Sequence, residues 1–144
     1  MSEILVLSEF KDNLIEFFDD LIDQLPKEGV LVMLRLFLVN NVPVKDIMDH
    51  FNHNINKDSQ LLRTMVKHRN ESFFLENDPF GFAGHVKDSA NHLKGVWRSP
   101  DLDDDDKAMI WSWVDAFIAI GDKYTKCVAD REKSEKDAQL KDTS

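Results

Sequence analysis

The chain has 144 residues, of which 42% are hydrophobic and 31% are charged, and its formal net charge at pH 7 is −9. This length and composition predict one globular domain that buries a core, and they exclude an intrinsically disordered chain. The acidity disfavours direct binding to nucleic acids and to anionic membrane surfaces, because both are negatively charged, and it favours a basic protein partner.

The first predicted elements are two helices. Residues 8–25 carry apolar side chains three and four positions apart, which is typical of an amphipathic helix. Ser8 suits its N-cap and Pro26 suits its end. Residues 29–40 are nearly all apolar, and we expect a buried helix because no second strand is available to pair with a strand there.

Arg35 interrupts the apolar run of residues 30–39. A buried guanidinium needs a carboxylate or a helix end as its partner, whereas a side chain that extends along the helix can reach solvent. The sequence leaves both arrangements open and favours the second. The run is also too short to cross a bilayer, which takes about 20 residues.

Three helices and one helical turn are predicted in the middle of the chain. A helix over residues 43–55 follows Asn41, which suits a cap, and a shorter helix covers residues 58–68. The stretch NESFFLENDPFGF predicts a short helical turn and then a loop, because Pro and Gly interrupt helices. Helical spacing resumes over residues 82–97.

The last helix is predicted to begin within SPDLDDDD, residues 99–106. Ser99 as the N-cap, Pro100 in the first turn and the aspartates that follow are typical of an exposed helix start. Asp103 or Asp104 is the alternative cap, if the helix begins later.

These elements predict an all-α fold, a single-domain bundle of about six helices. We expect the helical domain over residues 1–127. Residues 128–144 are charged and nearly free of apolar side chains, so we expect a mobile tail there, with a helical extension as the alternative.

The aspartate cluster between Asp101 and Asp106 also has to be compared with a calcium site. An EF-hand loop that started at Asp101 would need Gly at its sixth position and Glu at its twelfth. Asp106 and Ser112 stand at those two positions. The sequence therefore favours a helix start, and whether the cluster binds a cation in another geometry stays open.

A catalytic centre is not predicted. The chain contains no glycine-rich phosphate loop, no GxSxG elbow and no HExxH motif, and no cofactor is implied. His50 and His53 stand three apart, a spacing that can chelate a metal, but their apolar neighbours define another face as the inner one. We expect a protein that is not an enzyme, with weak metal binding as an alternative.

The cellular compartment is inferred from the single cysteine and the first residues. Cys127 has no second cysteine to pair with, so a reducing compartment is expected. Residues 1–10 contain Glu3 and Glu9 and lack a basic start, so we expect no secretory signal peptide. These features predict an intracellular protein that is not secreted.

Aromatic residues are the candidate contacts for a protein partner. Trp is enriched among binding hot spots, and Trp111 falls at the edge of the apolar stripe of the last helix. We expect a docking face formed by Trp111, Phe73, Phe74 and Phe80. An exposed aromatic patch of several hundred Å² would support this expectation, and complete burial of all four would count against it.

Three blocks of the sequence resemble a known group of proteins. The blocks lie within residues 8–125 and are FKDNLIEFFDDLIDQLP, ESFFLENDPF and VWRSPDLDDDDKAMIWSWVDAFIAIGDKY. They are similar to small acidic helical proteins encoded by large double-stranded DNA viruses of algae and protists. The resemblance implies a viral protein of the host cytoplasm or of the virion, and it assigns no catalytic residues.

The leading hypothesis is a non-enzymatic protein that binds other proteins. With the resemblance, it becomes a minor structural or assembly component of a large DNA virus, with a capsid or host protein as its partner. The first alternative is a host-modulating helical module that holds a partner's amphipathic helix in a groove between the second and last helices. The second is a weak metal-binding protein, and the oligomeric state is not predicted.

Overall fold

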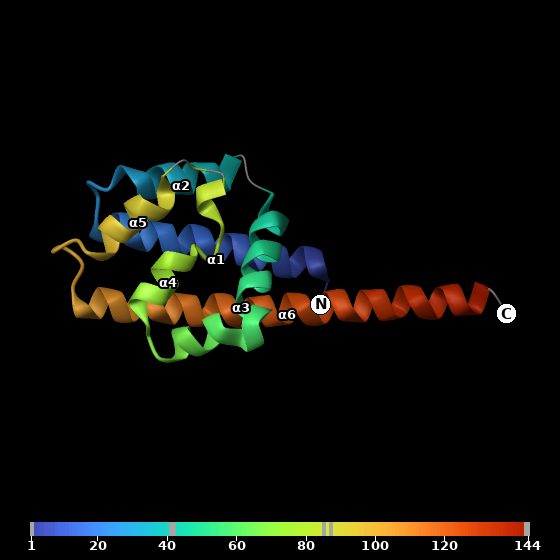
Figure 1. The fold of residues 1–144 in the computed structure, drawn as a ribbon. Coiled ribbons are helices and arrows are strands. Elements are labelled where there is room, and N and C mark those ends of the chain that lie inside the picture. Colours follow the sequence, from blue (N-terminus) through green and yellow to red (C-terminus); the bar gives the residue numbers. More distant parts are fainter. Residues whose placement is uncertain (1, 41–42, 85, 87, 143–144) are drawn as a thin grey trace.

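The computed structural model describes residues 2–40, 43–84, 86 and 88–142, and every regular element in this part of the chain is a helix (Figure 1). The predicted all-α, single-domain fold is confirmed. None of the described helices is both long enough and apolar enough to cross a membrane. In chain order the elements are α1 (Glu3–Gln24), α2 (Gly29–Asn40), α3 (Val44–Lys67), α4 (Glu71–Asn77), the short 3-10 helix η1 (Phe82–Gly84), α5 (Ser89–Trp97) and α6 (Asp104–Asp142).

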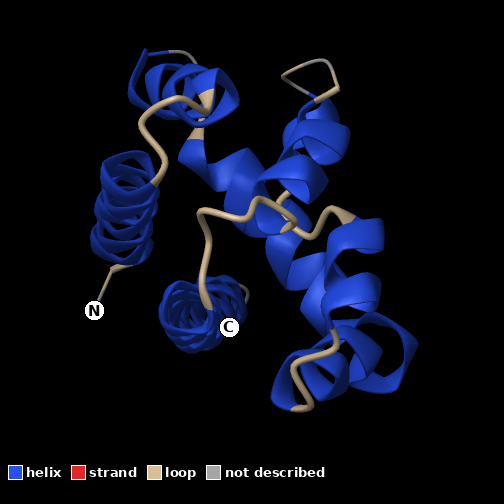
Figure 2. Cartoon of the chain, turned by 90° about the vertical axis from the view of Figure 1, so that its left-hand side faces the viewer, coloured by secondary structure: helices blue, strands red, loops and turns tan. Residues whose placement is uncertain are grey.

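The core forms where α1, α3 and α6 meet, and Figure 2 looks along α6 at this arrangement. The apolar stripe of α1 is buried, as its spacing predicts. The ring of Phe10 meets that of Phe117 edge to face at 5.9 Å, and Phe51 stacks on Phe80 at 4.7 Å. Burial of one such side chain contributes roughly 1.5–3 kcal/mol, so this aromatic layer is a main source of stability.

Helix α1 begins earlier than the sequence predicts. Its N-cap is Ser2, whose side chain accepts a hydrogen bond from Leu5 N at 3.3 Å, so the prediction of Ser8 was wrong. The physical reason is Val6, which is fully buried and therefore keeps the preceding turn of helix against the core. The helix ends at Gln24, close to the predicted stop.

The two helices predicted over residues 43–55 and 58–68 occur within α3, whose axis is broken at residues 57–60. The predicted start of the second helix at residue 58 was therefore wrong, because residues 58–60 belong to the break. Asp58, Ser59 and Gln60 adopt the left-handed conformation, with φ angles of 52°, 57° and 65°. The break turns the second half of α3 in a new direction (Figure 1). The predicted cap Asn41 lies outside the described residues, and Pro43 occupies the N-cap position.

The single helix predicted over residues 82–97 was wrong in its first half. Residues 82–84 form η1, and α5 begins only at Ser89. Asp88, the N-cap of α5, has a left-handed backbone with φ of 60°, which a continuous α-helix does not permit. Apolar spacing alone does not reveal such a break, because Phe82 and Val96 still both face the core.

Helix α6 begins at Asp104, and Asp103 is its cap. Asp106 N donates to Asp103 Oδ1 at 2.8 Å, and Asp103 N donates back to Asp106 Oδ2 at 3.2 Å, which is the reciprocal pattern of a capping box. The start at Ser99 and Pro100 was wrong, and the later alternative is the observed one. Ser99 Oγ instead accepts a hydrogen bond from Asp101 N within the preceding turn.

The charged segment after Val128 is a continuation of α6 that extends to Asp142 and projects beyond the rest of the bundle (Figure 1). The helical extension, left open by the sequence, is therefore the observed backbone. Residues 129–140 are all exposed, so they bury nothing in the core. The mobility predicted for residues 128–144 stays a prediction, and residues 143–144 lie outside the described part of the chain.

Candidate functional site

Helix α2 presents apolar side chains to solvent as well as to the core. Leu31, Leu34 and Leu38 are buried. The α2 apolar face, as we call it, consists of Val32 (40% exposed), Met33 (59%), Leu36 (52%) and Val39 (40%). A helix that is apolar all round is normally covered on all sides, so this face departs from the usual pattern of a small soluble domain.

Arg35 is the single charged residue of α2, and it connects this helix to α1. Its guanidinium forms an ion pair with Asp19, and its side chain is 36% exposed. The two arrangements that the sequence left open therefore occur together, because the side chain reaches the surface and meets a carboxylate there.

A row of carboxylates follows the exposed side of α1. The α1 acidic stripe consists of Asp12, Glu16, Asp19 and Asp23, all of which are exposed. Their spacings of four, three and four residues place them on one face of the helix. Asp19 belongs to the stripe and binds Arg35 of α2, so the acidic stripe lies on the helix that α2 packs against and meets α2 at this ion pair.

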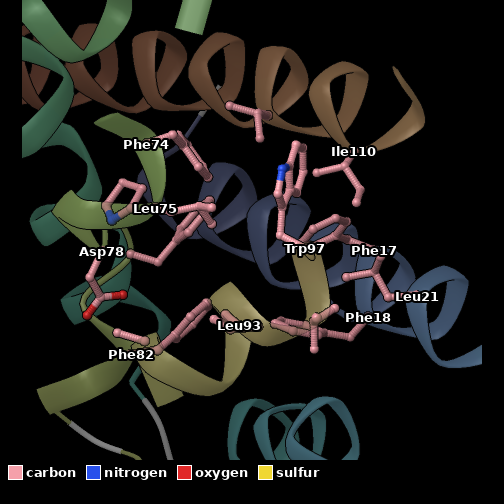
Figure 3. A pocket seen from close by; sticks show the side chains of 15 residues that line it. Phe17, Phe18, Leu21, Phe74, Leu75, Asp78, Phe82, Leu93, Trp97 and Ile110 are labelled. Atoms are coloured by element: carbon pink, nitrogen blue, oxygen red, sulfur yellow. The ribbon is translucent and has the colours of Figure 1, made fainter. Parts of the chain in front are cut away.

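An apolar pocket lies between α1, α4, α5 and α6 (Figure 3). Its volume is about 90 Å³, and its lining includes Phe18, Phe74, Leu93 and Trp97. A cavity of about 150 Å³ is known to hold a benzene molecule, and sites for larger ligands measure roughly 300–1,000 Å³. The pocket is therefore too small for a metabolite, and we interpret it as a gap in the packing.

The four aromatic residues predicted to form a docking face do not make an exposed patch. Trp111 and Phe80 are buried, and Phe73 and Phe74 are half-buried. Phe74 packs edge to face against Trp111 at 5.5 Å, while Phe80 stacks on Phe51 of the core. These side chains contribute to internal packing. Among the described residues, α2 has the largest group of exposed large apolar side chains, with four, and the others are Ile4 and Leu5 on α1, Leu61 on α3 and Leu140 on α6.

The sequence contained a signal for the α2 apolar face. Residues 29–40 hold one charged side chain, so any exposed part of this helix has to be apolar. The interpretation as a fully buried helix missed this consequence. Trp111 was predicted as a contact because Trp is enriched at interfaces. Trp and Phe side chains also pack in protein cores, and this is where Trp111 and Phe80 lie.

Neither candidate metal site gathers ligands in the structure. His50 and His53 are both exposed. Among the described residues, no three His, Cys, Asp or Glu side chains are placed so that they could hold one metal ion. In the aspartate cluster, the carboxylates of Asp103 and Asp106 accept backbone hydrogen bonds at the start of α6.

Lys45, Asp49 and Tyr124 form a polar cluster where α3 meets α6. Lys45 Nζ lies 2.6 Å from Asp49 Oδ2, and this hydrogen bond raises the pKa of Lys45. Burial, and then the negative charge of Asp49, raises the pKa of Tyr124. Lys45 and Asp49 lie on α3 and interact with Tyr124 of α6. We therefore interpret the cluster as a contact that connects the two helices.

No protein family model, curated protein or solved structure matches the chain. The surface of this molecule is therefore the guide to its function. Its two distinctive features are the α2 apolar face and the α1 acidic stripe beside it.

Proposed function

We propose that this chain is a non-enzymatic protein-interaction module and that the α2 apolar face is its docking surface. The observation that carries the proposal is the exposure of four large apolar side chains on a helix with one charged residue. Water is a poor solvent for such a face, so a partner that covers it gains the free energy of removing apolar surface from water.

The occupant that we propose is an amphipathic helix of another protein. Positions 32, 36 and 39 follow the spacing of four and three residues that one side of a helix presents. Ridges of this kind pack into the grooves of a second helix, and an amphipathic helix supplies the matching apolar stripe. The contact adds one more helix to a bundle that consists of helices throughout its described part.

The resemblance to small acidic proteins of large DNA viruses supports a capsid protein or a host protein as the source of that helix. The chain then serves as a minor structural or assembly component, with host modulation as the second candidate. A hydrophobic groove between α2 and α6 would favour host modulation. The apolar pocket has no lining residue from α2, so the geometry favours the outer face of α2 for either role.

The proposal is tested with a synthetic helical peptide that has a leucine stripe and an uncharged, glutamine-rich polar face. Leu36→Asp places a carboxylate in the middle of the α2 apolar face. Leu140→Asp makes the same change at an exposed leucine on α6, where the side chain is 68% exposed, and serves as the matched control. Fluorescence anisotropy of the labelled peptide gives the dissociation constant for each protein.

We expect Leu36→Asp to weaken binding by at least about tenfold, the loss typical of a central contact in an interface. Leu140→Asp should leave the dissociation constant unchanged. Both variants should remain folded by circular dichroism, because both side chains are exposed. If the peptide does not bind the wild-type protein, or if it binds the Leu36→Asp variant with the same affinity, the proposal is wrong.

A further inference from the structure

The α1 acidic stripe indicates the charge of the partner. We infer that the docking helix is basic as well as apolar, with Lys or Arg along the flank that faces α1. This inference rests on the proposed function, because it concerns the same surface and the same occupant.

The first reason is position. Asp19 belongs to the stripe, and its ion pair with Arg35 joins the stripe to α2. On α2, Arg35 lies between the buried leucines and the exposed residues Val32 and Val39, as the angle of 100° per residue requires. A helix seated on the α2 apolar face therefore has one flank directed toward the carboxylates of α1.

The second reason is that most of this negative charge is uncompensated. Arg35 pairs with Asp19, whereas Asp12, Glu16 and Asp23 form no ion pair with any described residue. Asp12, Glu16 and Asp23 are exposed carboxylates on the helix next to the α2 apolar face. They select a partner of opposite charge and accelerate its approach.

The same charges argue against a second copy of this chain as the occupant. A two-fold pair that packed α2 against α2 would bring together the same patch from both copies. In an antiparallel pair of α2 helices the two acidic stripes would lie on the same side of the interface, and like charges across an interface oppose association. The net charge of −9 adds to this repulsion. A different, basic protein fits the surface better.

The experiment compares three peptides that share one leucine stripe and differ only in the flanking residues, which are Lys, Gln or Glu. Each is titrated against the wild-type protein at low and at high ionic strength. We expect the Lys peptide to bind roughly tenfold more tightly than the Glu peptide at low ionic strength, as several exposed ion pairs would produce. High salt should reduce this ratio, because it screens exposed charges.

Two variants then locate the effect. The stripe variant carries Asp12→Asn, Glu16→Gln and Asp23→Asn, and it retains Asp19 for the pair with Arg35. The control variant carries Asp130→Asn, Glu132→Gln and Asp137→Asn, three exposed positions on the extension of α6. The two proteins have the same net charge. The stripe variant should lose most of its preference for the Lys peptide, and the control variant should keep it.

The outcomes distinguish this inference from the proposed function. If all three peptides bind wild type with equal affinity and Leu36→Asp weakens each of them, docking on α2 stands and the basic partner is refuted. If the stripe and control variants lose the preference to the same extent, total charge is responsible and the inference also fails. If no peptide binds, the proposed function itself is wrong.

Discussion

A polar contact between α3 and α6 fixes how closely these helices approach. Asn52 Nδ2 donates to Gly121 O at 3.2 Å and to Thr125 Oγ1 at 3.1 Å. A Cβ at position 121 would lie 2.5 Å from Asn52 Oδ1. Glycine inside a helix costs about 1 kcal/mol relative to alanine, and at this site the close approach of Asn52 explains its presence.

Gly121→Ala should therefore lower the free energy of unfolding by about 1–3 kcal/mol, although alanine is the better helix former. Gly95 in α5 is the matched control, because a Cβ there would meet nothing within 4 Å. Gly95→Ala should raise the free energy of unfolding by up to about 1 kcal/mol. Urea denaturation of both variants makes the comparison, and equal stabilisation of the two would contradict this account of Asn52.

Single residues also show where prediction from sequence stops. Ser99 and Asp103 both have the side chain of an N-cap, so the sequence offered both starts for α6. Leu102 is 5% exposed, and its burial draws residues 99–102 into a turn that packs on the bundle. Because of that tertiary contact, the helix begins after Asp103. The contact cannot be predicted from the local sequence.

At the scale of elements, periodic segments were predictable and interruptions were not. The stripe of α1 and the apolar run of α2 specify two of the helices directly. The break before α5 depends on Asp88, which adopts a left-handed backbone without being glycine. Aspartate adopts this conformation more often than most residues, but the preference is too weak to locate a break, so the packing of the neighbouring helices decides its conformation.

The extension of α6 lies outside the core. Residues 129–140 are exposed, and charged pairs such as Arg131 and Glu135, whose atoms lie 3.9 Å apart, are the kind of contact that supports its helix. Exposed pairs of this type contribute roughly 0.3–0.5 kcal/mol each, which is far less than burial of a core residue.

We therefore expect backbone amides of residues 132–140 to exchange hydrogen much faster than those of residues 110–124 in the buried half of α6. A chain shortened to end at residue 134 should unfold within about 0.5 kcal/mol of the full chain, because no core side chain is removed. Hydrogen exchange and urea denaturation provide the two readouts. Slow exchange throughout α6 would mean that the extension is held by contacts that the isolated chain does not contain.

At the scale of the whole molecule, the distribution of surface character was the least predictable property. Composition gave the net charge and the aromatic content, but tertiary packing decided that Trp111 and Phe80 face inward. Helix α2 packs against α1 and α5, and this arrangement leaves four of its apolar side chains exposed to solvent. A run of apolar residues predicts burial, and only the assembled bundle shows how much of each helix it covers.

The most direct test of the central claim follows the methionine methyl groups by NMR while the leucine-stripe peptide with the glutamine-rich face is added. Met33 is 59% exposed within the α2 apolar face, whereas Met48 is fully buried and Met65 and Met109 are half-buried on α3 and α6. Docking on α2 predicts a saturable shift of the Met33 methyl resonance while the resonances of Met48, Met65 and Met109 stay unchanged. A peptide that binds and leaves Met33 unmoved while shifting Met65 or Met109 would place the docking surface elsewhere and contradict the account.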